Sequence, residues 1–205
     1  QILFMLGLLL ICLFFATNQN LLPHLWMRLL IIIMMLMTVL LWPLLILLLA
    51  AAVASLYGRI RPAILSITGL SWLLALGPFA ALAFTVYWLG QVAAGTSLTW
   101  QIEWLPTLGL SLGFYFDSLS GLFALLVTGI GTLVILYSGS YFKGDASAWR
   151  FLAYLLLFMT AMLGLVMAGD VLTLFIFWEG TSITSFLLVA YKTKDEEARK
   201  GAFKA

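Results

Sequence analysis

Hydrophobic positions run along this chain in long unbroken stretches, and only short polar segments separate them. Because a helix needs about 20 apolar residues to cross a hydrocarbon core of about 30 Å, these stretches predict membrane-spanning helices. Five of them meet or approach that length: 40–57, 63–89, 114–139, 149–168 and 171–191. Two further apolar runs, 1–16 and 25–39, lie upstream.

The upstream region has no simple division into spans. As one helix, the stretch 25–57 would be about 50 Å long, too long for a single crossing. Pro43 lies inside it and favours a kink or a break there. We therefore treat 1–39 as an apolar N-terminal segment of open role. The sequence starts at Gln1 and stops just after a charged loop, so we expect a fragment cut at both ends.

The polar segments that follow each of the five spans predict the orientation. Their Lys and Arg counts, from first to last, are two, none, two, none and four. The basic residues are Arg59, Arg61, Lys143, Arg150, Lys192, Lys194, Arg199 and Lys200. This alternation is what the positive-inside rule requires of consecutive spans. It predicts that 40–57 enters from outside and that the loop 192–200 is cytoplasmic.

The segment 97–116, between the second and third spans, has a different pattern. Residues 97–105 alternate loosely, Pro106 and Gly109 follow, and 110–116 is strand-like in composition. Two short strands around such a turn predict a hairpin on the outer surface. A plain interfacial loop is the alternative.

Composition supports lipid as the solvent for much of the chain. Of the 205 residues, 64% are hydrophobic and 9% charged, against about 45–50% and about 25% in soluble domains. A net charge of +2 gives no argument for nucleic acid. With one cysteine, Cys12, and one histidine, His24, we expect no metal site and no cofactor. The sequence has no nucleophile–base pair or phosphate-binding glycine loop, so nothing indicates a self-contained enzyme.

One acidic residue lies deep inside a predicted span. Glu179 is nine residues into the stretch 171–191. A carboxylate there costs about 2.5–3.5 kcal/mol on insertion scales, and such residues usually mark ion or proton pathways. Thr181 and Ser182 follow it closely, and Ser182 at i+3 shares its helix face. We predict that Glu179 carries protons; the alternative is an inert, hydrogen-bonded carboxylic acid.

The remaining acidic residues have structural explanations. Asp170 precedes the fifth span and is expected to cap it, as Asp often does. Asp145 lies in a polar loop. Asp117 opens the third span; we expect a cap there, with a role at the outer mouth of an ion path as the alternative.

Several motifs resemble one family of membrane proteins. They are Phe114-Tyr-Phe-Asp-Ser-Leu-Ser120, Gly129-Ile-Gly131 with Tyr137, Tyr154 through Gly164, Gly169-Asp170, and Phe177-Trp-Glu-Gly-Thr-Ser182. Together they resemble the antiporter-like subunits shared by respiratory complex I and the Mrp-type cation/proton antiporters. Residues 201–205 look like the start of that family's sixth helix.

The resemblance implies an all-α polytopic transmembrane bundle, of which the chain holds the first five helices of a fourteen-helix core. Residues 40–108 would hold the first two helices and the outer loop, and 109–205 helices three to five with the start of helix six. It places an essential glutamate at Glu179, whose lysine partner in helix seven lies beyond Ala205. We assign Asp117, Thr181, Ser182 and Lys204 to an accessory proton path.

Two branches of the family compete. Residues 155–164 and 181–187 are more similar to the large Mrp chain of the A type, whereas Trp178-Glu-Gly180 is more similar to the complex I chain, since the Mrp branch usually has leucine where this chain has Gly180. We favour proton-coupled cation transport by an A-type subunit. The alternatives are a proton-pumping subunit of NADH:quinone oxidoreductase and a membrane scaffold without transport.

The resemblance also implies partners and a location. We expect a multi-pass protein of the plasma (inner) membrane, surrounded by lipid and by other membrane subunits of one complex. Protons, and Na+ or K+, would be the transported ions.

Overall fold

The computed structural model describes residues 39–60, 66–105, 110–145 and 147–191. The chain divides into a unit up to Val39 and a second unit from Leu40 onward. The second unit contains five long helices, a hairpin and a short 3-10 turn. In chain order these are η2 (Val39–Leu41), α3 (Trp42–Ile60), α4 (Ile67–Ala93), β1 (Leu98–Leu105), β2 (Leu110–Phe116), α5 (Ser118–Tyr141), α6 (Ala148–Val166) and α7 (Val171–Val189).

The five predicted spans are confirmed as helices, and their ends follow local chemistry. All five are long and apolar enough to cross a membrane. Pro43 lies in the first turn of α3, directly after the 3-10 turn, where a missing N–H is tolerated. Pro78 stays inside a continuous α4. The Ser66 hydroxyl caps α4 by accepting from Gly69 N at 3.1 Å.

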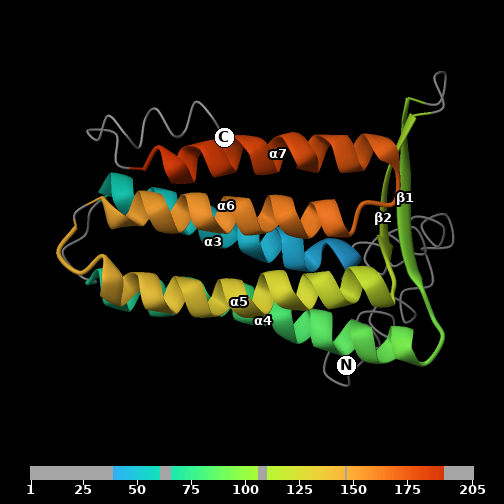
Figure 1. Cartoon of the computed structure of the whole chain (residues 1–205), viewed down its shortest axis with the longest axis horizontal. Helices are drawn as coiled ribbons and strands as arrows, with labels where there is room; N and C mark the ends of the chain where they lie inside the picture. Colours follow the sequence, from blue (N-terminus) through green and yellow to red (C-terminus); the bar gives the residue numbers. More distant parts are fainter. Residues whose placement is uncertain (1–38, 61–65, 106–109, 146, 192–205) are drawn as a thin grey trace, which may run out of the picture. The chain divides into compact units, whose positions relative to one another are not determined.

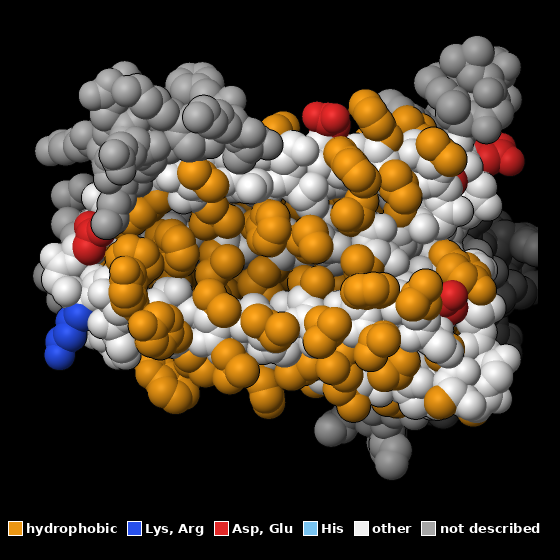
Figure 2. Space-filling model, in the orientation of Figure 1, with side chains coloured by type: hydrophobic (Ala, Val, Ile, Leu, Met, Phe, Trp, Pro, Cys, Tyr) orange, Lys and Arg blue, Asp and Glu red, His pale blue; other side chains and the backbone are white. Residues whose placement is uncertain are grey.

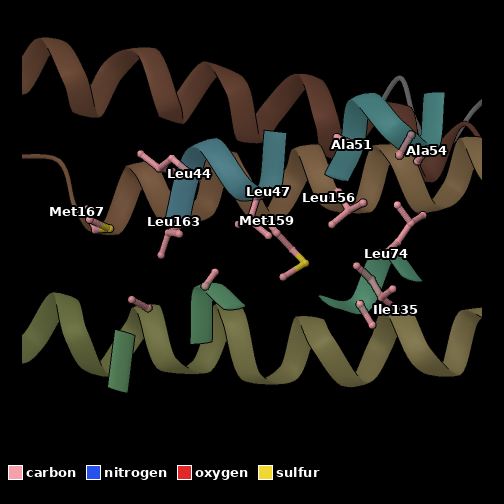
Figure 3. Close-up of a cluster of buried hydrophobic side chains, with 14 of the residues drawn as sticks. Leu44, Leu47, Ala51, Ala54, Leu74, Ile135, Leu156, Met159, Leu163 and Met167 are labelled. Carbon is pink, nitrogen blue, oxygen red and sulfur yellow. The ribbon is translucent and has the colours of Figure 1, made fainter. Parts of the chain in front are cut away.

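The helices pack side by side as a bundle (Figure 1). α3 packs against α4 and α6, α5 packs against α4 and α6, and α7 packs mainly against α6. Leu47, Leu74, Leu156 and Leu163 are among the buried side chains of the core between them (Figure 3).

Glycines allow the closest approaches between helices. A side chain at Gly131 would overlap Met159, which reaches into the core from α6. A side chain at Gly58 would overlap the Trp149 ring in the same way. Small residues at such contacts are typical of helices packed in membranes.

Hydrophobic side chains gather over the face of the bundle that Figure 2 shows, and large hydrophobic side chains of α3, α4, α5 and α7 are exposed. Leu49, Trp72, Leu133 and Val171 are all more than 60% exposed. Soluble monomers rarely expose contiguous apolar area on this scale. Lipid or further membrane helices must therefore contact these faces.

The predicted hairpin is confirmed, and the alternative of a plain loop is wrong. β1 and β2 pair antiparallel, with Leu98 opposite Phe116 and Ile102 opposite Leu112. The edge of β2 that does not pair with β1 contacts the turn between α6 and α7. There, Gly169 N donates to Gly113 O at 2.8 Å, and Tyr115 N donates to Met167 O at 2.8 Å. The hairpin is thereby joined to the start of α7 (Figure 1).

Candidate functional site

Glu179 is the ninth of the 19 residues of α7. At 1.5 Å per residue it lies about 12 Å along a helix about 28 Å long. The structure therefore places this carboxylate near the middle of a segment that has the length and hydropathy of a membrane span.

The Glu179 side chain lies on a face of α7 that the described helices leave exposed. Phe175, Ser182, Ile183 and Phe186 are exposed too, at i−4, i+3, i+4 and i+7 from Glu179, and so form one stripe with it. We call these five residues the outer stripe of α7. The opposite face contacts α6, where Gly180 leaves its Cα close to Ala161.

The hydroxyls beside Glu179 donate to their own helix. Thr181 Oγ1 donates to Trp178 O at 2.7 Å, and Ser182 Oγ to the same carbonyl at 3.3 Å. This is the usual behaviour of such residues within helices. Both oxygens keep acceptor capacity. Ser182 can therefore accept a hydrogen bond from water beside the outer stripe, whereas Thr181, at i+2 from Glu179, lies on another side of the helix. Lys204 lies outside the described residues.

Asp117 caps α5, as expected. Its Oδ1 accepts from Ser120 N at 2.8 Å, and Asp117 N donates to Ser120 Oγ at 2.7 Å. The two bonds form a capping box. Hydrogen bonds from Ser120 lower the pKa of the Asp117 carboxyl below its usual value, because they stabilise the charged form.

Both ends of α7 are held by contacts that sequence patterns do not reveal. At the start, the expected Asp170 cap is confirmed, with Oδ1 accepting from Thr173 N at 2.8 Å. The contact that no pattern reveals there is the one in which the Thr173 hydroxyl accepts from Gly113 N at 2.9 Å. Beyond the other end, Tyr191 OH donates to Asp145 Oδ2 at 2.6 Å. Burial and this bond raise the pKa of Tyr191, so the phenol stays a donor. The partners are 60 and 46 residues apart, beyond the reach of any local pattern.

Within the described ranges, no group of three or more His, Cys, Asp or Glu side chains is arranged to hold a metal ion. The chemically distinctive feature of the described arrangement is a carboxylate in the middle of an apolar helix. The fold and this site define a multi-pass membrane protein with a carboxylate at mid-span.

Comparisons with known proteins agree with that class. Residues 100–152 match the family model described as NADH-Ubiquinone oxidoreductase (complex I), chain 5 N-terminus. The A subunit of the Na(+)/H(+) antiporter of Alkalihalophilus pseudofirmus is 42% identical over 135 residues, which cover 65% of this chain and 17% of that protein. The A1 subunit of the Na(+)/H(+) antiporter of Staphylococcus haemolyticus is 37% identical over 136 residues, covering 66% of this chain and 17% of that protein.

Two solved structures have a similar fold. The Mrp complex from Dietzia sp. contains a chain with a TM-score of 0.60 and 31% identity, matched over 73% of this chain and 16% of that chain. The archaeal membrane-bound sulfane sulfur reductase, a respiratory membrane complex, matches with a TM-score of 0.64 and 21% identity, over 82% of this chain and 33% of that chain. The second match supports the fold alone.

These matches confirm the resemblance to the antiporter-like subunits that Mrp-type antiporters and complex I share. The chain spans about 17% of the length of the curated relatives it matches. The five spans and the bacterial antiporter relatives identify it as a multi-pass plasma membrane protein.

Proposed function

We propose that this chain forms the first helices of an A-type subunit of a multisubunit Na+(K+)/H+ antiporter, and that Glu179 carries protons in it. The observation that carries the proposal is the placement of Glu179, at mid-span and on a helix face that the other described helices leave open. Relatives named as A subunits of Na(+)/H(+) antiporters support the transport class.

That placement of Glu179 carries a free-energy cost. A carboxylate at the bilayer centre is expensive in contact with lipid, so such groups face protein or a water-filled cavity. The outer stripe of α7 would then face further membrane helices of a longer protein rather than lipid. A lysine from the family's helix seven is the expected partner there. When the pair closes, the lysine favours the carboxylate; when it separates in a dry site, the acid form is favoured.

Thr181, Ser182, Asp117 and Lys204 belong to the proposal as accessory groups. Ser182 shares the outer stripe with Glu179, so it can accept a hydrogen bond from a water beside the carboxylate. Thr181 follows the glutamate by two residues and therefore lies on another side of the helix, so its assignment rests on its place in the same span. Asp117 lies at the start of α5, where its main contribution is the helix cap. We assign Asp117 a secondary role at the mouth of the path, and we assign Lys204 to the same accessory path.

The same relatives support the domain boundaries and the partner subunits that we propose. Residues 40–108 would hold the first two spans and the hairpin strand β1, and 109–205 the antiporter-like region. The partners would be the other membrane subunits of one complex, because a matched structure is described as the Mrp complex.

A second candidate is a proton-pumping membrane subunit of NADH:quinone oxidoreductase. The match of residues 100–152 to the complex I chain 5 model favours it, as does Gly180 after Glu179. Both candidates need a proton-exchanging carboxylate, whereas a membrane scaffold without transport does not.

The experiment compares proton flux in everted vesicles carrying the full-length complex with Glu179→Gln, Glu179→Asp or Glu103→Gln. The Gln variant keeps size and hydrogen bonding but cannot ionise, so flux should fall to background while assembly is normal. The Asp variant should keep part of the flux, because it keeps the acid. Glu103 is exposed on strand β1, and its Gln variant is the matched control that should transport normally. Near-normal flux in Glu179→Gln would establish a scaffold role and overturn the proposal.

A further inference from the structure

Helix α7 is loosely embedded for a helix that carries a functional carboxylate. Among its residues only Thr173 and Thr184 are buried. It packs mainly along α6, whereas α3 to α6 each contact at least two neighbouring helices. Within the described residues, the contacts at its start are therefore important for its position.

Thr173 supplies the most specific of these contacts. It is 1% exposed, and its hydroxyl accepts from Gly113 N of β2 at 2.9 Å while donating to Asp170 Oδ2 at 3.1 Å. Its own N–H donates to Asp170 Oδ1 at 2.8 Å. One residue thus completes the helix cap and joins α7 to the hairpin.

This use of a threonine differs from the other buried threonines. Thr85, Thr128 and Thr160 each donate to the carbonyl four residues earlier in their own helix, which is the common arrangement. Thr173 instead reaches an element 60 residues away. Its hydroxyl therefore has a role that helix packing alone does not require.

The hairpin side of the contact is equally constrained. Both polar backbone atoms of Gly113 contact this region, since its N–H reaches Thr173 and its carbonyl accepts from Gly169 N. A Cβ at Gly113 would lie 2.8 Å from Asp170 Oδ2. One turn further along α7, the Phe177 ring packs edge-on against Phe114 of β2, with centroids 5.7 Å apart.

We propose that Thr173 is a positioning residue, whose hydroxyl ties α7 to the hairpin and thereby sets the rotation and depth at which Glu179 is presented. This inference rests on the proposed function, in which Glu179 carries protons. Glu179 follows Thr173 by six residues, about 9 Å along the helix. A change at the tie moves the carboxylate without touching it.

The test uses the full-length complex in everted vesicles, with the ion-driven proton flux expressed per assembled complex. Thr173→Val keeps the shape and removes the hydroxyl, which leaves Gly113 N without its partner. Because misplacing a reacting group by about 1 Å can cost about 100-fold, we expect the maximal rate to fall roughly tenfold with little change in the apparent KM for the cation. Thr173→Ser keeps the hydroxyl and should restore the rate. Thr85→Val is the matched control and should transport normally.

A second variant alters the contact between Thr173 and Gly113 on its hairpin side. Gly113→Ala directs a methyl group at Asp170 Oδ2 and should reproduce the loss of rate, which keeps the test decisive if Thr173→Val assembles poorly. Normal flux in an assembled Thr173→Val complex would overturn the inference, as would equal losses in the Ser and Val variants. Failure of both Thr173→Val and Gly113→Ala to assemble would overturn it too, because the hydroxyl would then serve assembly.

Glu179→Gln in the same vesicles separates the two proposals. If that variant is inactive and Thr173→Val transports normally, only the positioning role fails. If Glu179→Gln transports normally, the proton-carrier role fails, and the positioning role with it.

Discussion

The contact between α6 and α7 at Gly164 allows a stability prediction with a worked magnitude. A Cβ at Gly164 would lie 2.5 Å from Cζ of Phe177 and closer still to two other ring carbons. Favourable carbon–carbon contacts lie at about 3.5–4.0 Å, so in Gly164→Ala the ring must move by about 1 Å or more. Phe114 packs against that ring and limits its retreat.

Forcing a methyl group into such a contact typically costs about 1–3 kcal/mol. Gly129→Ala is the matched control, because a Cβ there would meet only Leu82, at an ordinary 3.8 Å. We therefore expect Gly164→Ala to lower the melting temperature of the purified full-length protein. Gly129→Ala should not lower it, because alanine without a clash is at least as favourable as glycine inside a helix.

The assay is thermal unfolding in detergent, followed by loss of the monodisperse peak on size exclusion after heating. Equal melting temperatures for Gly164→Ala and the unsubstituted protein would refute this prediction, because the close contact at Gly164 would then have no effect on stability. A loss in Gly129→Ala as large as in Gly164→Ala would refute it as well, since the effect would belong to any alanine in a span.

Two further predictions concern orientation and the α5 cap. A cysteine replacing Gln101 should react with a membrane-impermeant reagent from outside, and one replacing Lys143 from the cytoplasmic side; labelling of both from one face would refute the topology. Asp117→Asn keeps a capping acceptor and should weaken transport only modestly, whereas Asp117→Ala should cost about 1 kcal/mol of stability. Folding lowers the pKa of Asp117 below its usual value of 3.8. The ionised cap therefore stabilises the folded state above pH 3.8, and this stabilisation is lost as the pH falls through the lower pKa of the folded state. A Tm difference between the unsubstituted protein and Asp117→Ala that persists undiminished in strong acid would contradict this sign.

Sequence patterns predicted the elements of this fold better than their connections. Hydropathy gave five spans, although helix α4 begins at Ile67, four residues after its predicted start, because Ser66 provides the cap. Alternation and the Pro106–Gly109 turn gave the hairpin. The caps at Asp117 and Asp170 were also predicted, since they depend only on residues three positions away.

The long-range contacts could not be predicted from one sequence. Nothing near Thr173 indicates that its hydroxyl meets Gly113, because the bond exists only once β2 lies against the start of α7. The contact between Tyr191 and Asp145 joins the α5–α6 loop to the far end of α7 in the same way. The depth of Glu179 was readable from hydropathy, but its exposed side of the helix depends on which face packs against α6.

The measurement that tests the central claim most directly is the protonation of the Glu179 carboxyl itself. Infrared difference spectra of the purified full-length complex, recorded across a pH titration, report the carbonyl band of protonated carboxylic acids. The account predicts a band that disappears as the pH rises and that is missing from the Glu179→Gln complex. Identical difference spectra for the two complexes would contradict it, because Glu179 would then exchange no proton.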